Sequence, residues 1–511
     1  MLSQKSEKIA IPLRPMSEVY IGTGNGLIKK ALKKGLDALG GLSKFIKPGQ
    51  SVFIKPNLTD GRDPITGGVT DKRLVETLLQ MIREECQPGH VMVGENTGDG
   101  GVIGRYFAAN GWDIMCEKYD AELVDFEKDE WGDYPLENPM YLDVIRLPKK
   151  VVEADVYITL PVLKNHDTVC VTAAIKNSYG LLPAVDRRET HRYNAVEQCL
   201  TDIARVRKPD LAIVDGRIGM EGIAGGSHFD HPRYANRIII GADPVAVDVV
   251  CTHIMDQNPR VRYLQWCDYY GVGNCNLDYI TIKGMSIEEA KMHFMTPAEE
   301  TEEVTDGKLK LRDLDSCSRC RAAAQGPLHR IHGPERLMND VEILYGPGDF
   351  DPSTVRERCI LVGDCIQEKY RNLGLWIPGC PMEEKAYFEA LEKLEVICNK
   401  CEKAVRAFIA KHTEEELAFI RIMASNKRIF QGSANKAEAT DYTLLVGDCM
   451  FWYGRHHKKR SQNEIQTRGL DVDVNDIVVH MPGHDLSVED IEAVFQKMRT
   501  HYLAHRPATE E

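Results

Sequence analysis

Cysteines in the C-terminal part of the chain are spaced as metal ligands are. Cys317 and Cys320 form a C-x-x-C pair, and single cysteines follow at Cys365, after "CILVGD", and at Cys380, after "IPG". Four thiolates can bind a [4Fe–4S] cluster or a tetrahedral zinc ion. A zinc ribbon usually draws its ligands from two C-x-x-C knuckles, and this segment has one. We therefore expect an iron–sulfur cluster, with zinc as the alternative and unliganded cysteines as the third outcome.

The same order of motifs occurs a second time. The candidate ligands of this second copy are Cys398, Cys401, Cys449 and His484. The distance from Cys320 to Cys365 is 45 residues, and that from Cys401 to Cys449 is 48. Three motifs in the same order indicate an internal duplication. Because "PGH" replaces "PGC", the second copy is predicted to bind a cluster, a Cys3His zinc ion or no metal.

The first copy resembles a known cluster motif. "LVGDC" followed by "IPGCP" is similar to the second half of the motif in the small subunits of nickel–iron hydrogenases and the twenty-kilodalton subunit of respiratory complex I. The matching residues are Gly363, Cys365, Pro378, Gly379, Cys380 and Pro381, with Cys317 and Cys320 upstream. In those proteins the motif surrounds a [4Fe–4S] cluster on a flavodoxin-like sheet. The resemblance implies a cluster and electron transfer.

Ionisable side chains are dense in the segment "LKNHDTVCVTAAIKNSYGLLPAVDRRETHR". Lys164 and His166 end an apolar run, and Lys176 and His191 follow within one loop–helix unit. If these groups converge, histidine can carry a proton while lysine binds a carboxylate. The segment therefore predicts a catalytic site for a small anionic substrate or cofactor. The alternative is a solvated basic loop.

Other polar residues follow apolar runs at the ends of predicted strands. The candidate binding residues at these positions are Lys55, Asn57, Glu95, Asp215 and Glu221. Each could instead be ordinary turn chemistry at a strand end. In "GADPVAVD", Asp243 followed by Pro244 predicts the cap of a helix and not a ligand.

The elements that must position these residues follow an α/β pattern. From about residue 17 to 285, short β-branched runs such as "SVFIKPNL" alternate with helical stretches such as "DKRLVETLLQMIREE". This alternation predicts a largely parallel sheet, in which chemistry gathers beyond the carboxyl ends of the strands. The predicted fold is α/β, with this sheet followed by two smaller duplicated α/β metal-binding units. The charged stretch 295–313 is predicted to be a solvated connector.

The length of 511 residues exceeds what one ordinary core supports. The predicted domains are residues 1–294, 314–396 and 397–511. Seven further cysteines lie in apolar surroundings and are predicted to be core residues. They are Cys86, Cys116, Cys170, Cys199, Cys251, Cys267 and Cys275.

Several motifs of the N-terminal part together resemble one family. "IKPNL", "VGE", "LKNH", "IKNSYGLLP", "IVDG", "GMEG" and "GADPVAVD" occur in the order typical of the domain-of-unknown-function family 362, over about residues 48–260. Members are often fused to iron–sulfur segments, but the family implies no reaction. His166, Lys176 and His191 also have spacings similar to those of the nickel-pincer lactate racemases, which implies that this region binds a metal or cofactor.

Composition limits the partners. The formal net charge of −13 gives no electrostatic reason to bind nucleic acid or an anionic membrane. No apolar run is long enough to span a bilayer, and the N-terminus lacks the apolar segment of a secretory signal, so a cytoplasmic location is expected.

Three functions remain open from the sequence. The first is an iron–sulfur redox protein or oxidoreductase with an electron-transfer partner, whose α/β domain binds a small anionic ligand. The second is a non-redox isomerase or racemase that uses the lysines and histidines, with structural metal sites. The third is a non-catalytic metal-binding protein.

Overall fold

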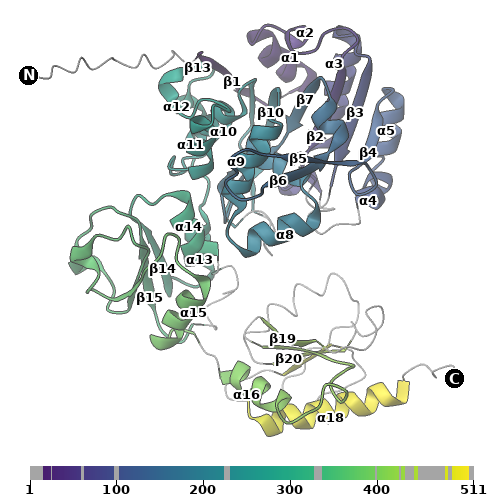
Figure 1. Cartoon of the computed structure of the whole chain (residues 1–511). Coiled ribbons are helices and arrows are strands. Elements are labelled where there is room, and N and C mark those ends of the chain that lie inside the picture. The colour runs from purple at the N-terminus through teal and green to yellow at the C-terminus, as the bar shows by residue number, and fades with distance from the viewer. Residues whose placement is uncertain are drawn as a thin grey trace, which may run out of the picture. The chain divides into compact units, whose positions relative to one another are not determined.

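The computed structural model divides into two compact units. Figure 1 labels helices and strands of the chain. The N-terminal unit comprises Met1–Pro297 and Cys317–Ala322, and the C-terminal unit comprises Ala298–Ser316 and Ala323–Glu511. The structure describes residues 15–24, 26–58, 63–96, 103–223, 231–326, 328, 337–397, 400–424, 427–431, 442–446, 478–481 and 486–505. The predicted division into three domains stays a prediction.

In the described part of the N-terminal unit, one sheet of eleven strands organises the fold. Its main order is β13-β1-β12-β10-β7-β2-β3-β4, in which β12 alone runs antiparallel to its neighbours. The strands of this order are β1 (Ser17–Thr23), β2 (Ser51–Pro56), β3 (His90–Glu95), β4 (Glu122–Asp125), β7 (Val156–Leu160), β10 (Leu211–Met220), β12 (Arg237–Gly241) and β13 (Ile280–Gly284). The predicted α/β fold with a mostly parallel sheet is confirmed.

Shorter strands extend this sheet beside the candidate site. They are β8 (Val162–His166), β9 (Cys170–Thr172) and β11 (Pro232–Arg233). β8 pairs with β10 and forms an antiparallel hairpin with β9. A separate two-stranded sheet joins β5 (Trp131–Pro135) to β6 (Val144–Pro148).

Helices cover both faces of the main sheet (Figure 1). Val52 and Ile54 of β2 belong to one apolar core, and Phe53 between them belongs to the other, because successive side chains of a strand point to opposite faces. The first core is covered by α1 (Ile28–Ala38), α3 (Lys72–Glu85), α4 (Ile103–Ala109) and α5 (Trp112–Lys118). The second is covered by α7 (Ala174–Asn177), α9 (Val196–Val206), α10 (Pro244–Ile254) and α11 (Arg262–Tyr269). Shorter or peripheral helices are α2 (Leu42–Phe45), α6 (Lys149–Glu153), α8 (Ala184–Arg192) and α12 (Ile287–Ala290).

The order of strands creates a switch point between β2 and β7. From β2 the chain proceeds through β3 to β4 on one side, whereas β7 is followed by β10 on the other side. In open parallel sheets, ligands bind in the crevice beyond the carboxyl ends of two such strands. The fold therefore singles out the region after Pro56 and Leu160.

The described residues of the C-terminal unit form two four-stranded sheets. The first has the order β14-β15-β16-β17 and is parallel throughout; the second has the order β19-β18-β20-β21, with only β19 antiparallel. The strands are β14 (Leu309–Asp313), β15 (Val341–Tyr345), β16 (Cys359–Val362), β17 (Leu375–Ile377), β18 (Arg421–Ala424), β19 (Lys427–Gln431), β20 (Thr443–Val446) and β21 (Val478–Met481). The helices from residue 297 onward are α13 (Pro297–Val304), α14 (Ser318–Gln325), α15 (Glu384–Lys393), α16 (Lys400–Ile409) and α18 (Val488–His505).

The two small sheets pair their motif-bearing strands in the same register. Val362 at the end of β16 pairs with Ile377 at the end of β17, and Val446 of β20 pairs with Met481 of β21 in the same way. In both sheets, "GDC" directly follows the first strand of the pair and "PGC" or "PGH" follows the second. This equivalence supports the predicted duplication.

The prediction that residues 295–313 form a solvated connector is wrong, because this stretch forms α13 and β14. Leu309 and Leu311 are buried while Lys310 and Arg312 alternate with them. This period of two is the pattern of a half-buried strand, which the density of charges in the stretch obscured.

Other local predictions are confirmed. Asp243 caps α10 by accepting the N–H groups of Val245 and Ala246, and Pro244 stands at the first helical position. The seven scattered cysteines are buried, except Cys275, which is half-buried. None of the described helices combines the length and apolar character that crossing a membrane requires, and the cytoplasmic location stays a prediction.

Candidate functional site

A buried ion pair lies at the carboxyl ends of β2 and β3. Lys55 Nζ is 2.7 Å from Glu95 Oε2, and both side chains are almost fully buried. The same Glu95 oxygen accepts the N–H of Leu58. Burial lowers the pKa of Lys55, and the charge of Glu95 opposes this shift. The pair thus places a desolvated cation beside the switch point, where water competes weakly for it.

Asn177 holds the end of β2 against the end of β7. Its Nδ2 donates to Thr159 Oγ1 at 2.8 Å and to the carbonyl of Lys55 at 3.2 Å. Its Oδ1 accepts from Asn57 Nδ2 at 3.0 Å and from Lys55 Nζ at 3.4 Å. The structure therefore brings together Lys55, Asn57 and Glu95, as predicted for a binding site, around an asparagine of α7.

The β8–β9 hairpin carries Lys164 and His166. Lys164 Nζ donates to the carbonyl of Gly68 at 3.0 Å. His166 Nδ1 accepts the N–H of Thr168 at 3.0 Å and lies 2.9 Å from Asp167 Oδ1. When Nδ1 accepts this N–H in the neutral ring, the imidazole proton is on Nε2.

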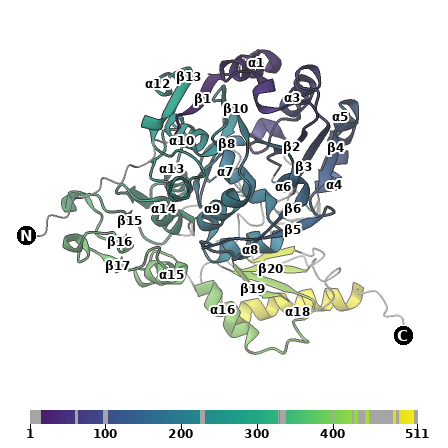
Figure 2. The same cartoon turned by 45° about the horizontal axis from the view of Figure 1, so that its top comes forward.

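Lys176, His191 and Tyr179 form the opposite side of the site. Lys176 Nζ lies 4.4 Å from the centre of the Tyr179 ring, and His191 meets the same ring edge-on with centroids 5.4 Å apart. The rings of His166 and His191 are nearly parallel, at 15°, with centroids 6.5 Å apart. The four predicted catalytic residues therefore converge. Figure 2 shows the elements that carry them, β8, α7 and α8, together with α9.

Positive charge dominates this site. Burial, followed by the charge of Lys164, lowers the pKa of Lys176 to about 7, and the charges of Arg187 and Lys55 act in the same direction. Asp167 opposes the shift. Burial and the charge of Lys176 also lower the pKa values of both histidines. At neutral pH the imidazoles are therefore uncharged, and a bound anion would relieve the repulsion among the cations and make the imidazoles stronger bases.

Three of the buried oxygen atoms that lack a hydrogen-bond partner among the described residues belong to this part of the chain. They are Asn57 Oδ1, Asn96 Oδ1 and Thr172 Oγ1. Asn96 follows Glu95, and Thr172 pairs with Lys164 across the hairpin. Because buried polar atoms are normally hydrogen-bonded, such atoms suit a ligand that carries hydroxyl or amino donors.

Asp215 and Glu221 make other contacts. Asp215 pairs with Arg217 at 2.7 Å, and Arg217 also reaches Asp71. Glu221 accepts the N–H of Met295 and lies 3.7 Å from Arg233. The predicted place of Asp215 at a strand end is wrong, because it lies inside β10, whereas Glu221 directly follows that strand. The contacts of Lys55, Asn57 and Glu95, by contrast, join one network.

The predicted metal ligands divide between the units. Cys317 and Cys320 belong to the N-terminal unit, and Cys365 and Cys380 to the C-terminal unit. A hydrogen bond from Cys320, with help from Arg262, lowers the pKa of Cys317 to about 4, which favours the thiolate that metal ions bind.

The loops of Cys365 and Cys380 are bonded to each other. Asp364 donates its N–H to the carbonyl of Gly379 and accepts the N–H of Gly379. No group of three or more histidine, cysteine, aspartate or glutamate side chains among the described residues is arranged to hold a metal ion. Of the second set, Cys401 is buried, and Cys398, Cys449 and His484 lie outside the described residues. Both ligand sets stay predictions.

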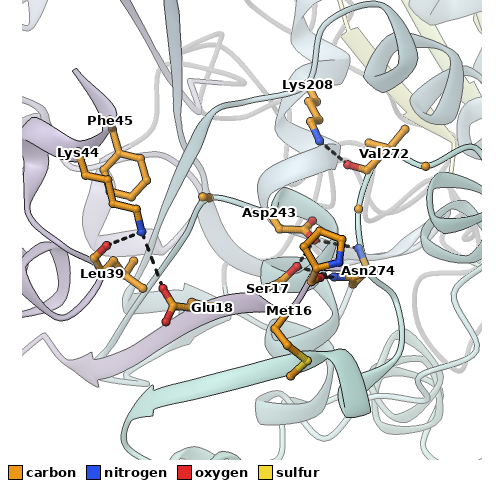
Figure 3. A pocket seen from close by; sticks show the side chains of 14 residues that line it. Met16, Ser17, Glu18, Leu39, Lys44, Phe45, Lys208, Asp243, Val272 and Asn274 are labelled. Atoms are coloured by element: carbon orange, nitrogen blue, oxygen red, sulfur yellow. Dashed lines mark hydrogen bonds and ion pairs between the residues drawn. The ribbon is translucent and has the colours of Figure 1, made fainter. Parts of the chain in front are cut away.

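A surface cavity of about 410 Å³ lies at the other edge of the main sheet. It is lined by the start of β1 and the residues that follow β12, which is the edge opposite the carboxyl ends of β2 and β7. Figure 3 shows that its polar side chains satisfy one another: Ser17 donates to Asp243, and Lys44 faces Glu18. The cavity therefore adds nothing to the lysine–histidine site.

Comparisons with known proteins identify the family of this chain. Residues 52–253 match the family described as domain of unknown function DUF362. A thylakoid-associated protein of Synechocystis sp. is 30% identical over 239 residues, which cover 46% of this chain and 72% of the relative. The chain belongs to the DUF362 family. The matched region contains every predicted catalytic residue and the whole network around Lys55.

Two solved structures show weaker likeness to this DUF362 protein. The lactate racemase apoprotein from Thermoanaerobacterium thermosaccharolyticum is 10% identical, with a TM-score of 0.33, and the match covers 75% of this chain and 90% of that one. A Thermotoga maritima protein is 12% identical, with a TM-score of 0.31, and the match covers 46% and 61%. At these scores neither likeness bears on the activity of this chain.

Three contributors to the site of this DUF362 protein were not predicted. Asn177 and Tyr179 stand beside Lys176 in "IKNSYG", so their place in the motif was the available signal. Asp248, in "GADPVAVD", accepts the N–H groups of Ala174 and Ile175 at the start of α7. Nothing in the sequence pairs it with α7, because 73 or more residues separate them.

Proposed function

We propose that the N-terminal unit is a proton-transfer enzyme of the isomerase or racemase type, acting on a small anionic substrate. The observation that carries this proposal is the convergence of His166, Lys176 and His191 at the carboxyl ends of parallel strands next to the switch point. The two imidazoles face each other, with an ammonium group beside them. This set can bind an anion and move a proton at an adjacent carbon.

The roles of the residues follow from their surroundings. Lys164 and Lys176 attract the anionic group of the substrate, and its hydroxyl or amino group donates to Asn57 Oδ1. One imidazole accepts the proton from carbon, and the Lys176 ammonium stabilises the resulting enolate. A proton then returns to the carbon from the imidazolium or from the second histidine.

Hydrogen exchange tests this function. The protein would be incubated in D₂O with 2-hydroxy, 2-amino and dicarboxylic acids, and deuterium at the carbon next to the carboxylate would be measured by NMR. We expect exchange with at least one class, reduced by about a hundredfold or more in His166→Gln or His191→Gln. His253→Gln, on α10 and outside the site, is the matched control. Exchange that both site variants retain would overturn the proposal.

Electron transfer is a second candidate function, favoured by the bonded loops of Cys365 and Cys380. In this proposal, the thiolates of the first copy would hold an iron–sulfur cluster, and such a cluster would supply electron transfer to a protein partner. Zinc in the same position would make the unit structural. The cluster supplies the redox chemistry, while the chain supplies thiolates and backbone N–H groups close to sulfur.

A further inference from the structure

A buried hydrogen-bond chain leads to the helix that holds Lys176. Asp248 of α10 accepts the N–H groups of Ala174, at 2.5 Å, and Ile175, at 3.1 Å. It also accepts the hydroxyl of Tyr263 at 3.1 Å. α7 has only four residues and begins without a side-chain cap from its own N-cap residue, Ala173. Asp248 therefore supplies from another helix the acceptors that a short helix needs at its start.

The series of buried hydrogen bonds continues beyond Asp248. The N–H of Tyr263 donates to Glu197 of α9, and Glu197 also accepts the hydroxyl of Ser318. Ser318 Oγ in turn accepts the N–H of Arg262 at 2.8 Å. Asp248, Tyr263 and Ser318 are fully buried, and Glu197 nearly so. These hydrogen bonds thus connect the segment of the C-x-x-C pair to α7 through buried side chains.

We propose that Asp248 is the positioning residue for Lys176 and Asn177, and that Ser318, Glu197 and Tyr263 hold Asp248 in place. The proposal deepens the proposed function, since it concerns the same site, yet it rests on contacts that do not involve substrate. Asp248 fixes the start of α7; one turn later, Asn177 bonds β2 and β7, and Lys176 lies over Tyr179. A shift of α7 would move both side chains together.

The matched control lies on the same helix. Asp243 also accepts two backbone N–H groups, and it accepts Ser17 Oγ and the N–H of Asn274 as well. Its partners belong to the opposite edge of the sheet and not to α7. Asp243→Asn therefore removes a comparable carboxylate without touching the lysine–histidine site.

The experiment measures Lys176 directly in the full-length protein. Acetylation of lysines by acetic anhydride would be followed by mass spectrometry from pH 5 to 11. In the unaltered protein we expect the midpoint for Lys176 near 7. Asp248→Asn should raise this midpoint by about one pH unit or more, because a loosened α7 lets the ammonium reach water. Asp243→Asn should leave it unchanged.

A second variant and a second readout keep the inference testable. Tyr263→Phe removes one hydrogen bond to Asp248 and should raise the midpoint less than Asp248→Asn, even if the latter folds poorly. If a substrate is found, Asp248→Asn should lower kcat by about tenfold while KM changes less than about threefold. An unchanged midpoint in folded Asp248→Asn or in Tyr263→Phe would overturn the inference. Labelling needs no substrate, so a failed exchange assay would refute only the proposed function.

Discussion

At the scale of single residues, the N-terminal unit gathers charge at one site, where Lys55, Glu95 and Lys164 are buried and Lys176 is half-buried. Lys55 and Glu95 neutralise each other, and the charges that act most strongly on the pKa of Lys176 are the cations Lys164, Arg187 and Lys55 and one opposing carboxylate, Asp167. Such an excess is costly in an apolar interior. It is the arrangement expected of a site whose ligand brings negative charge.

Because Lys55 and Glu95 form a buried ion pair, we expect that removing either partner strongly lowers the free energy of unfolding. Glu95→Gln leaves the ammonium of Lys55 buried without a carboxylate, and we expect the free energy of unfolding to fall by about 3 kcal/mol in urea titrations. Lys55→Met combined with Glu95→Leu should be much less destabilised than either single change. Glu84→Gln, which breaks an exposed pair with Lys29, should have little effect. Equal losses for Glu95→Gln and Glu84→Gln would contradict the assignment.

Lys176 predicts a stability that depends on pH. Its pKa is about 7 in the folded protein and about 10.4 in an unfolded chain, so the folded state binds fewer protons between these values. The penalty for burying the ammonium is complete below pH 7 and is lost as pH rises towards 10.4. At pH 6, the free energy of unfolding of Lys176→Met should therefore exceed that of the unaltered protein. This difference should be smaller at pH 9.5.

Urea titrations at both pH values measure this difference. Inorganic phosphate at pH 6 should reduce the gain of Lys176→Met if an anion binds beside the ammonium. Lys208→Met, at the cavity on the opposite edge, is the control. Its free energy of unfolding should differ from that of the unaltered protein by the same amount at both pH values. A gain for Lys176→Met that does not change with pH would show that the lysine is solvated.

At the scale of elements, short segments between the strands decide the geometry of the site. The 3₁₀ turn η2 (Ser178–Leu181) follows α7 directly and packs on the ion pair. A Cβ at Gly180 would lie 2.9 Å from both Glu95 Oε1 and Lys55 Nζ. This glycine is required because the backbone approaches the pair so closely.

Gly180→Ala should therefore force the buried pair apart. We expect a loss of about 1–3 kcal/mol in the free energy of unfolding, together with weaker protection of the amides of α7 from hydrogen exchange. Gly326→Ala is the matched control, because a Cβ there meets no atom of the described residues within 4 Å. Its effect should stay within about 0.5 kcal/mol. Similar losses in the two variants would refute the close contact at Gly180.

At the scale of the whole molecule, a site-bearing α/β unit is combined with a unit of two small sheets. The sheets pair β16 with β17, and β20 with β21, in equivalent register. In each pair, the first strand ends directly before "GDC", and the second ends directly before "PGC" or "PGH". The carboxyl edges of these sheets are thus the predicted places for metal.

Metal analysis of the full-length protein tests that prediction. Protein purified without oxygen is expected to be brown and to contain iron and sulfide, whereas stoichiometric zinc in colourless protein would contradict the cluster. Cys365→Ser should lower the metal content per chain by about the content of one site. Cys359→Ser, which changes a buried cysteine of β16 outside the loop, should leave the content unchanged.

The sequence by itself determined the fold class, the capping of α10 by Asp243, and the residues at strand ends that could carry chemistry. These depend on local periodicity and turn chemistry, which neighbouring residues specify. The motif that contains Lys164, His166, Lys176 and His191 was therefore visible along the chain.

Only the tertiary structure decided which strand ends meet. Lys55 joins Glu95 and Asn177, whereas Asp215, equally prominent in the sequence, pairs with Arg217. The order of strands in the sheet makes this choice, and single-sequence periodicity contains no information about that order. For the same reason the role of Asp248 at α7 was invisible: its hydrogen bonds join segments that only the packing of α10 brings together.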